Sequence, residues 1–281
     1  MLTTSARVCS AASMGVAFLL LSCSGGPAPH KPGTPGFYWQ AAKETYAVGD
    51  YLKADEHLYQ LVRGSSEYAT RAQAWRLVVT GGLSSGYMEL AESYEAGTRS
   101  NRNNPSPFRK LMLEYRTRAN EQALQFAETF LSFQKSHKDP NVELGFGPPK
   151  GSSARVADLS RAADGVVLRP FEVDLAAQRA LERGVLLAAC LAVGAPEDVA
   201  KTQELLRAGS TQVPRATFIY AMADQLNNLA QLYTRAKADQ PDRLQMFVNH
   251  AQDALKGIPE TKETKQLVGK IEKALKASKR R

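Results

Sequence analysis

The segment from residue 108 to residue 133 constrains the fold most, because its apolar residues repeat with the period of an α-helix. Successive apolar positions are 4, 3, 4, 4, 3, 4 and 3 residues apart, at Phe108, Met112, Tyr115, Ala119, Ala123, Phe126, Phe130 and Phe133. This spacing places them on one face of a helix that we expect over residues 107–137. We expect that face to pack in a core, and an exposed aromatic groove for a partner is the alternative.

Helical periodicity continues through most of the chain beyond Phe37. It predicts two helices within residues 37–63 on either side of Gly49, and others at about 67–80, 84–97, 172–193, 196–208, 214–237, 240–256 and 261–278. We expect Gly81-Gly82 to end the helix at 67–80. Residues 154–171 are ambiguous between a short helix near 154–163 and an extended piece at 166–168. The sequence therefore predicts an all-α fold of antiparallel helix pairs.

Residues 37–63 resemble one tetratricopeptide repeat. That family has an early aromatic residue, Gly-Asp-Tyr at the turn, and then alanine and bulky apolar residues along the second helix. The matching positions are Trp39 or Tyr38, Ala42, Tyr46, Gly49, Asp50, Tyr51, Ala54, Leu58 and Leu61. No clean period of about 34 residues runs through the whole chain. Both a tetratricopeptide-like α-solenoid and an irregular helical bundle stay open.

The resemblance implies a curved array of helix pairs whose concave face holds a peptide or helix of a partner protein. The aromatic residues that we expect to line such a groove are Trp39, Tyr46, Trp75 and Tyr94.

The first 22 residues have the pattern of an export signal. Arg7 supplies a positive charge, and residues 11–22 form a largely apolar stretch of 12 residues. As a helix this stretch spans about 18 Å, too short for a bilayer core of about 30 Å. It ends in Leu20-Leu21-Ser22-Cys23, which resembles the bacterial lipobox. An ordinary secretory signal is the alternative, but it needs a small residue where Leu20 stands.

The lipobox resemblance implies cleavage before Cys23, a diacylglycerol thioether on its sulfur and an acyl chain on its amine. Two or three chains make such an anchor stable, whereas one chain binds only marginally. Ser24 in place of aspartate resembles outer-membrane sorting, so we expect a periplasm-facing location at the outer membrane. Nine of the thirteen residues in 24–36 are Gly, Pro or Ser. They predict an extended linker that holds the folded part clear of the bilayer.

These features divide the chain into five parts. Residues 1–22 are the signal peptide, residues 23–36 the lipidated cysteine and linker, and residues 37–138 an N-terminal helical region. Residues 139–171 form a connector rich in loops, and residues 172–281 a second helical region. We expect a lipid-anchored envelope scaffold for protein–protein contact. The alternative is a substrate-binding lipoprotein associated with a transporter, with a pocket between the two halves around residues 139–170.

The charge and the cysteines fit an exported chain. The formal net charge is +8, and loss of Arg7 with the leader leaves +7. An exported protein rarely meets nucleic acid, so simple solubility or contact with anionic lipid, cell-wall polymer or an acidic protein explains the excess. Of Cys9, Cys23 and Cys190 only the last keeps a free thiol in the mature chain. It lies in an apolar run, where we expect it to be buried.

We expect neither an enzyme nor a cofactor. The sequence contains no His-Glu-x-x-His zinc arrangement. Glu89 and Glu92 lie three residues apart on an expected helix, and we expect them on a solvated face. Residues 260–281 contain eight Lys or Arg and three Glu. The basic residues suit a helix C-terminus, and attraction to anionic headgroups or an acidic partner is the alternative.

Overall fold

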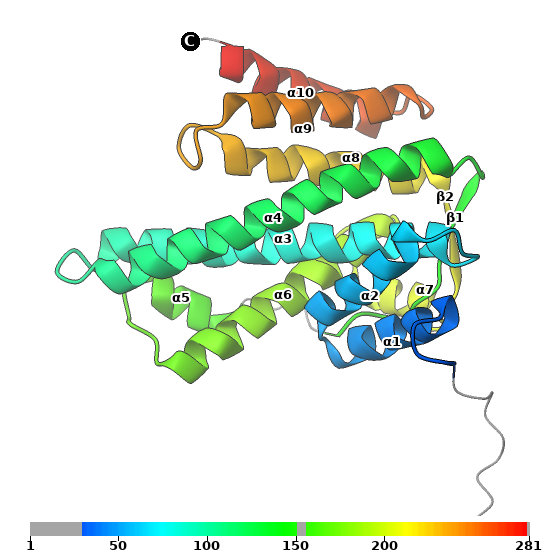
Figure 1. Ribbon diagram of the computed structural model, residues 1–281. Helices are drawn as coiled ribbons and strands as arrows, with labels where there is room; N and C mark the ends of the chain where they lie inside the picture. Colours follow the sequence, from blue (N-terminus) through cyan, green and yellow to red (C-terminus); the bar gives the residue numbers. More distant parts are fainter. Residues whose placement is uncertain (1–29, 151–155, 280–281) are drawn as a thin grey trace, which may run out of the picture.

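The computed structural model describes residues 30–150 and 156–279, and within these ranges the chain is mostly helical. Figure 1 shows the elements. In chain order they are α1 (Pro35–Val48), α2 (Tyr51–Arg63), α3 (Ala69–Ser100), α4 (Ser106–Ser136), β1 (Asn141–Leu144), α5 (Ala157–Ala163), α6 (Pro170–Ala192), α7 (Val199–Leu206), β2 (Thr211–Pro214), α8 (Arg215–Leu229), η1 (Ala230–Tyr233), α9 (Pro241–Lys256) and α10 (Lys262–Lys279). The expected all-α fold is confirmed. Among the described helices, none is both long and apolar enough to cross a bilayer.

The long helices α3 and α4 form an antiparallel pair at the centre of the molecule (Figure 1). Helices α8, α9 and α10 lie on one side of this pair, and α6 lies on the other side with α1, α2, α5 and α7. Helix α3 packs most extensively against α4 and α6. One continuous cluster of buried apolar side chains extends from Ala42 in α1 to Ile271 in α10. The helices before and after residues 139–171 therefore share a core.

The aromatic stripe of α4 faces this core, as its period predicts. Phe108, Phe126, Phe130 and Phe133 are all buried. The ring of Phe133 lies 5.3 Å from that of Phe218 in α8, so the stripe joins the two layers. Core packing, and not an exposed groove, is the role of this face.

The turn between α1 and α2 has the geometry that its residues favour. Gly49 adopts φ 86°, a left-handed conformation that glycine reaches without strain. The next residue, Asp50, accepts a hydrogen bond from the backbone N–H of Lys53 at 3.1 Å and caps α2. The helix pair at residues 37–63 is thereby confirmed, while its membership of a solenoid stays a prediction.

The expected break at Gly81-Gly82 is wrong, because α3 runs through both glycines without interruption. A Cβ on Gly82 would lie 2.4 Å from the Cα of Val185 in α6, and one on Gly184 would lie 2.2 Å from the carbonyl oxygen of Gly82. The two helices therefore cross with their backbones in direct contact. Glycine costs about 1 kcal/mol in a helix interior, and the close packing of α3 on α6 offsets that cost.

The connector after α4 contains a strand that the sequence pattern does not reveal. Strand β1 pairs antiparallel with β2, with Val142 opposite Val213. Two residues after β1, Phe146 is buried among the aromatic side chains of α1 and α3. Further along, the structure has both the short helix α5 and a non-helical segment at residues 164–169. Residues of the connector therefore pair with β2 and contribute buried side chains, including Phe146 and Leu159, to the core.

Candidate functional site

The aromatic residues expected to line a partner groove are mostly part of the core. Tyr46, Trp75 and Tyr94 are buried, and Trp39 is half-buried. The ring of Trp75 stacks on Phe146 at 4.8 Å, and the ring of Trp39 lies 4.9 Å from the same phenylalanine. These side chains fill the space between α1, α3 and the connector, and they offer a partner little surface.

Tyr94 belongs to a different cluster. Its ring stacks on Tyr115 of α4 at 5.7 Å, and burial raises the pKa of its hydroxyl far above the ordinary value. The four predicted aromatics therefore do not converge on one surface. Cys23, the predicted lipidation site, lies outside the described residues.

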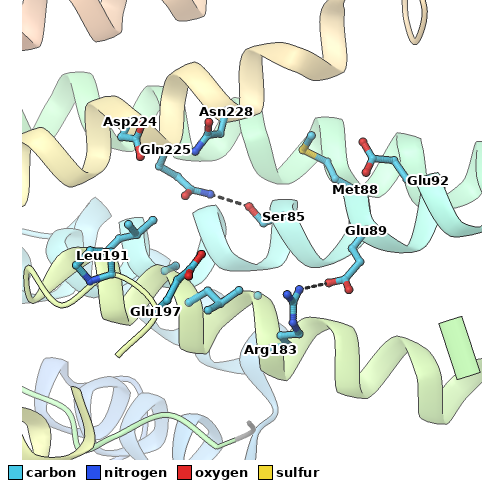
Figure 2. A pocket seen from close by; sticks show the side chains of 14 residues that line it. Ser85, Met88, Glu89, Glu92, Arg183, Leu191, Glu197, Asp224, Gln225 and Asn228 are labelled. Atoms are coloured by element: carbon cyan, nitrogen blue, oxygen red, sulfur yellow. Dashed lines mark hydrogen bonds and ion pairs between the residues drawn. The ribbon is translucent and has the colours of Figure 1, made fainter. Parts of the chain in front are cut away.

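A cleft of about 730 Å³ lies between α3, α6 and α8 (Figure 2). It begins beside the glycine contact of α3 and α6, where Gly184 lines its wall. Beyond that contact the larger side chains Met88, Leu187 and Leu191 line an apolar floor. Glu92, Pro196, Glu197 and Asn228 also line the cleft, and Pro196 and Glu197 are exposed at its rim. The cleft is therefore open to solvent.

Four carboxylates line the cleft, at Glu89, Glu92, Glu197 and Asp224. Glu89 accepts a hydrogen bond from Arg183 of α6 at 2.6 Å, and Glu92 pairs with Lys237. No ion pair of Glu197 or Asp224 is present among the described residues. The lining thus has more acidic than basic groups.

Asp224 and Gln225 of α8 are among the partly desolvated polar groups of the cleft. Burial raises the pKa of the Asp224 carboxyl, and the positive charge of Lys270 opposes part of that rise. Gln225 is buried and donates from Nε2 to the hydroxyl of Ser85 at 2.8 Å and to the carbonyl of Gly81 at 3.0 Å. These bonds join α8 to α3 beside the cleft, and Figure 2 shows the one between Gln225 and Ser85.

Glu197 lies at the mouth of the cleft in an unusual backbone conformation. Its φ is 62°, in the left-handed region that residues other than glycine rarely adopt. Its neighbour Ala195 is buried, and the N–H of Ala195 bonds to the carbonyl of Cys190 at 2.9 Å. The turn after α6 therefore directs a carboxylate to the rim at a conformational cost, and such strain is frequent at functional sites.

The lining combines apolar side chains with carboxylate, guanidinium and amide groups. The one hydroxyl in the lining, Ser85, is bonded to an amide, and no histidine, cysteine or lysine lines the cleft to act as its base. Within residues 30–150 and 156–279 no three His, Cys, Asp or Glu side chains are grouped to hold a metal ion. Cys190 is buried as expected, and burial raises its thiol pKa.

The sequence pattern identifies two residues of the cleft but not the basic side chains that pair with them. Glu89 and Glu92 are visible as a pair on one helix, yet their partners come from α6 and from the segment after η1. Arg183 follows Glu89 by 94 residues, and a single sequence holds no local signal for such a pairing.

Comparison of the chain with protein-family models, with curated proteins and with solved structures finds no match in any of the three.

Proposed function

We propose that this chain is a lipid-anchored scaffold of the cell envelope that binds a protein partner in the cleft between α3, α6 and α8. The lipobox-like residues 20–23 support the anchor, and Ser24 supports a periplasm-facing place at the outer membrane. The cleft supports the binding role. By analogy with tetratricopeptide proteins, the partner belongs to an outer-membrane assembly, secretion or pilus machinery, and analogy of fold alone does not fix which one.

The observation that carries the binding role is the combination of an apolar floor with an acidic rim. Met88, Leu187 and Leu191 can bury the apolar side of a peptide or helix. Glu197 at the exposed rim and Asp224 on the partly buried wall place carboxylates beside this floor. The cleft therefore fits a segment that alternates apolar with Lys or Arg residues. Such electrostatic matching raises the association rate and specificity more than it raises affinity.

The test is site-specific crosslinking in intact cells. A photo-reactive residue at Asn228, inside the cleft, captures a defined envelope protein, and one at Glu204 on the exposed side of α7 does not. The captured segment is then synthesised and its affinity for the purified protein is measured. Glu197→Lys weakens that affinity several-fold, and added salt weakens it as well. The matched reversal Glu204→Lys leaves it unchanged.

Equal crosslinks from both positions, or a captured segment whose binding Glu197→Lys leaves intact, would contradict the cleft as the binding surface. Far-UV circular dichroism of each variant checks that the helices are retained.

One observation favours a second candidate, a substrate-binding lipoprotein that works with a transporter. The cleft volume of about 730 Å³ lies within the range of about 300–1,000 Å³ that is common for small-molecule sites. Native mass spectrometry of the purified protein separates the two candidates. A bound small molecule that is lost on Leu187→Asp favours the transporter role, and a protein crosslink from Asn228 favours the scaffold.

A further inference from the structure

Three exposed apolar side chains lie within six consecutive positions where the chain passes from α5 into α6. Val166, Val167 and Phe171 are 41%, 50% and 57% exposed. Large apolar side chains with this exposure are few in the described residues, and these three fall within six positions of the chain. They form what we call the 166–171 patch.

The patch is held rigidly, so its exposure is a feature of the fold. Gly165 at φ 85° ends α5, and the N–H of Val166 bonds back to the carbonyl of Arg161 at 3.0 Å. Leu168, between the exposed residues, is buried in the core. Asn101 of the α3–α4 loop donates to the carbonyl of Gly165 at 3.0 Å. The apolar side chains therefore face water although the backbone that carries them is fixed.

Charged groups flank the patch at the start of α6. The guanidinium of Arg169 lies 4.5 Å from the centre of the Phe171 ring, and Arg169 and Arg161 both pair with Glu172. An arginine of this kind can keep its charge at the headgroup level while its stem and the aromatic ring enter the apolar side. The acidic partner Glu172 offsets part of the positive charge. The contact thus depends on apolar side chains and not on net positive charge.

The 166–171 patch and the start of α1 lie along the same edge of the molecule, at its two ends. In Figure 1 the start of α6 is at the lower left and the start of α1 at the lower right, while α10 is at the opposite, upper edge. Residues 24–34 separate the predicted lipidated cysteine from the start of α1 at Pro35. At about 3.1 Å per residue, that linker spans at most about 34 Å. Its glycines let it shorten, so it limits the distance to the bilayer without fixing it.

We infer that the 166–171 patch inserts into the interfacial region of the bilayer and orients the tethered body on it. Three partly exposed side chains offer on the order of 300 Å², short of the roughly 800 Å² per partner that a specific protein interface buries. Such an area is suited to shallow insertion that adds to an existing anchor. The inference rests on the proposed lipid anchor at Cys23. The body then lies against the membrane and does not stand clear of it.

Tryptophan fluorescence tests this at the patch itself. The lipidated protein carrying Phe171→Trp is purified from membranes and reconstituted on vesicles of phosphatidylcholine brominated along its acyl chains. Bromine quenches the larger part of the fluorescence that the introduced indole adds, with no requirement for anionic lipid. The control Gln266→Trp, exposed on α10 at the opposite edge, stays unquenched. The parent protein, with Trp39 and the buried Trp75, gives the background.

Val167→Trp provides a second probe if Phe171→Trp changes the helical content. Vesicle flotation reads the anchor separately. A protein that floats with the vesicles but shows no quenching at either position overturns the inference and leaves the anchor intact. In intact cells, a crosslink from a photo-reactive residue at position 171 to an envelope protein marks the patch as a protein interface and overturns the inference as well. A protein that does not float overturns both the anchor and the role of the patch.

Discussion

The contact between α3 and α6 predicts that one added methyl group destabilises the whole protein. In Gly184→Ala the new Cβ would lie 2.2 Å from the carbonyl oxygen of Gly82 and 2.9 Å from the backbone nitrogen of Gly86. Both are backbone atoms, so no side chain can rotate away and the helices must separate. Alanine favours the helix by about 1 kcal/mol, whereas overpacking of this kind costs about 3 kcal/mol.

We therefore expect Gly184→Ala to lower the free energy of unfolding by about 2 kcal/mol, the difference of these two terms. The melting temperature should fall by roughly 4–8 °C for a domain of this size. Urea unfolding followed by circular dichroism measures the change. The matched control is Gly269→Ala in α10, where a Cβ meets nothing within 4 Å. It should stabilise the protein by about 0.5–1 kcal/mol. A Gly184→Ala protein as stable as the parent would refute the close crossing.

Four further substitutions and treatments test the core and the charges. In the parent protein the buried guanidinium of Arg76 lies 2.9 Å from the carboxylate of Asp55, and Asp55→Ala removes this charge partner. The substitution should lower the free energy of unfolding in urea by about 3–5 kcal/mol. A cost below about 1 kcal/mol, as for an exposed pair, would contradict a buried ion pair. Trp75→Ala should lose about 3–5 kcal/mol because its ring is fully buried, and unchanged stability would place the ring at the surface. Hydrogen bonds from Arg169 and Arg161 hold the pKa of the Glu172 carboxyl at about 2, below the ordinary 4.5. Its contribution to stability is therefore present above pH 4.5 and fades as the pH falls towards 2. The difference in unfolding free energy between the parent and Glu172→Gln should shrink over that window, and a constant difference would disprove the assignment. Cys190 is buried with a raised thiol pKa, so a thiol reagent should modify it only after denaturant unfolds the chain, and rapid labelling of the native protein would contradict its burial.

Local pattern predicts the helices well where one face of the segment meets the core. The stripe of α4 is visible because its apolar residues keep the helical period from Phe108 to Phe133, and the α1–α2 turn is visible because Gly49 and Asp50 have the chemistry of a cap. Both signals lie within one segment of chain, and for that reason the sequence alone contains them.

Features that depend on distant parts of the chain are not predictable in this way. Gly81-Gly82 resembles a helix break locally, and only the approach of Gly184 explains why α3 continues through it. Strands β1 and β2 have four residues each, too few to give a clear alternation, and they pair across α5, α6 and α7.

The candidate site shows the same limit. Trp75 is the kind of large aromatic residue that can line a binding groove, but the ring of Phe146 from the connector stacks on it. The cleft that replaces it as the candidate site combines Glu89, Arg183 and Asp224 from three helices. Their convergence follows from the packing of α3, α6 and α8, which no local spacing encodes.

The lipid anchor is the claim on which the location, the scaffold role and the membrane contact all depend. Intact-mass and peptide mass spectrometry of the protein purified from its native membrane tests it most directly. We predict a chain that begins at Cys23, with the mass of a diacylglycerol thioether and an amide-linked acyl chain on that residue. A chain that begins at Met1, or one with an unmodified cysteine at position 23, would contradict the account.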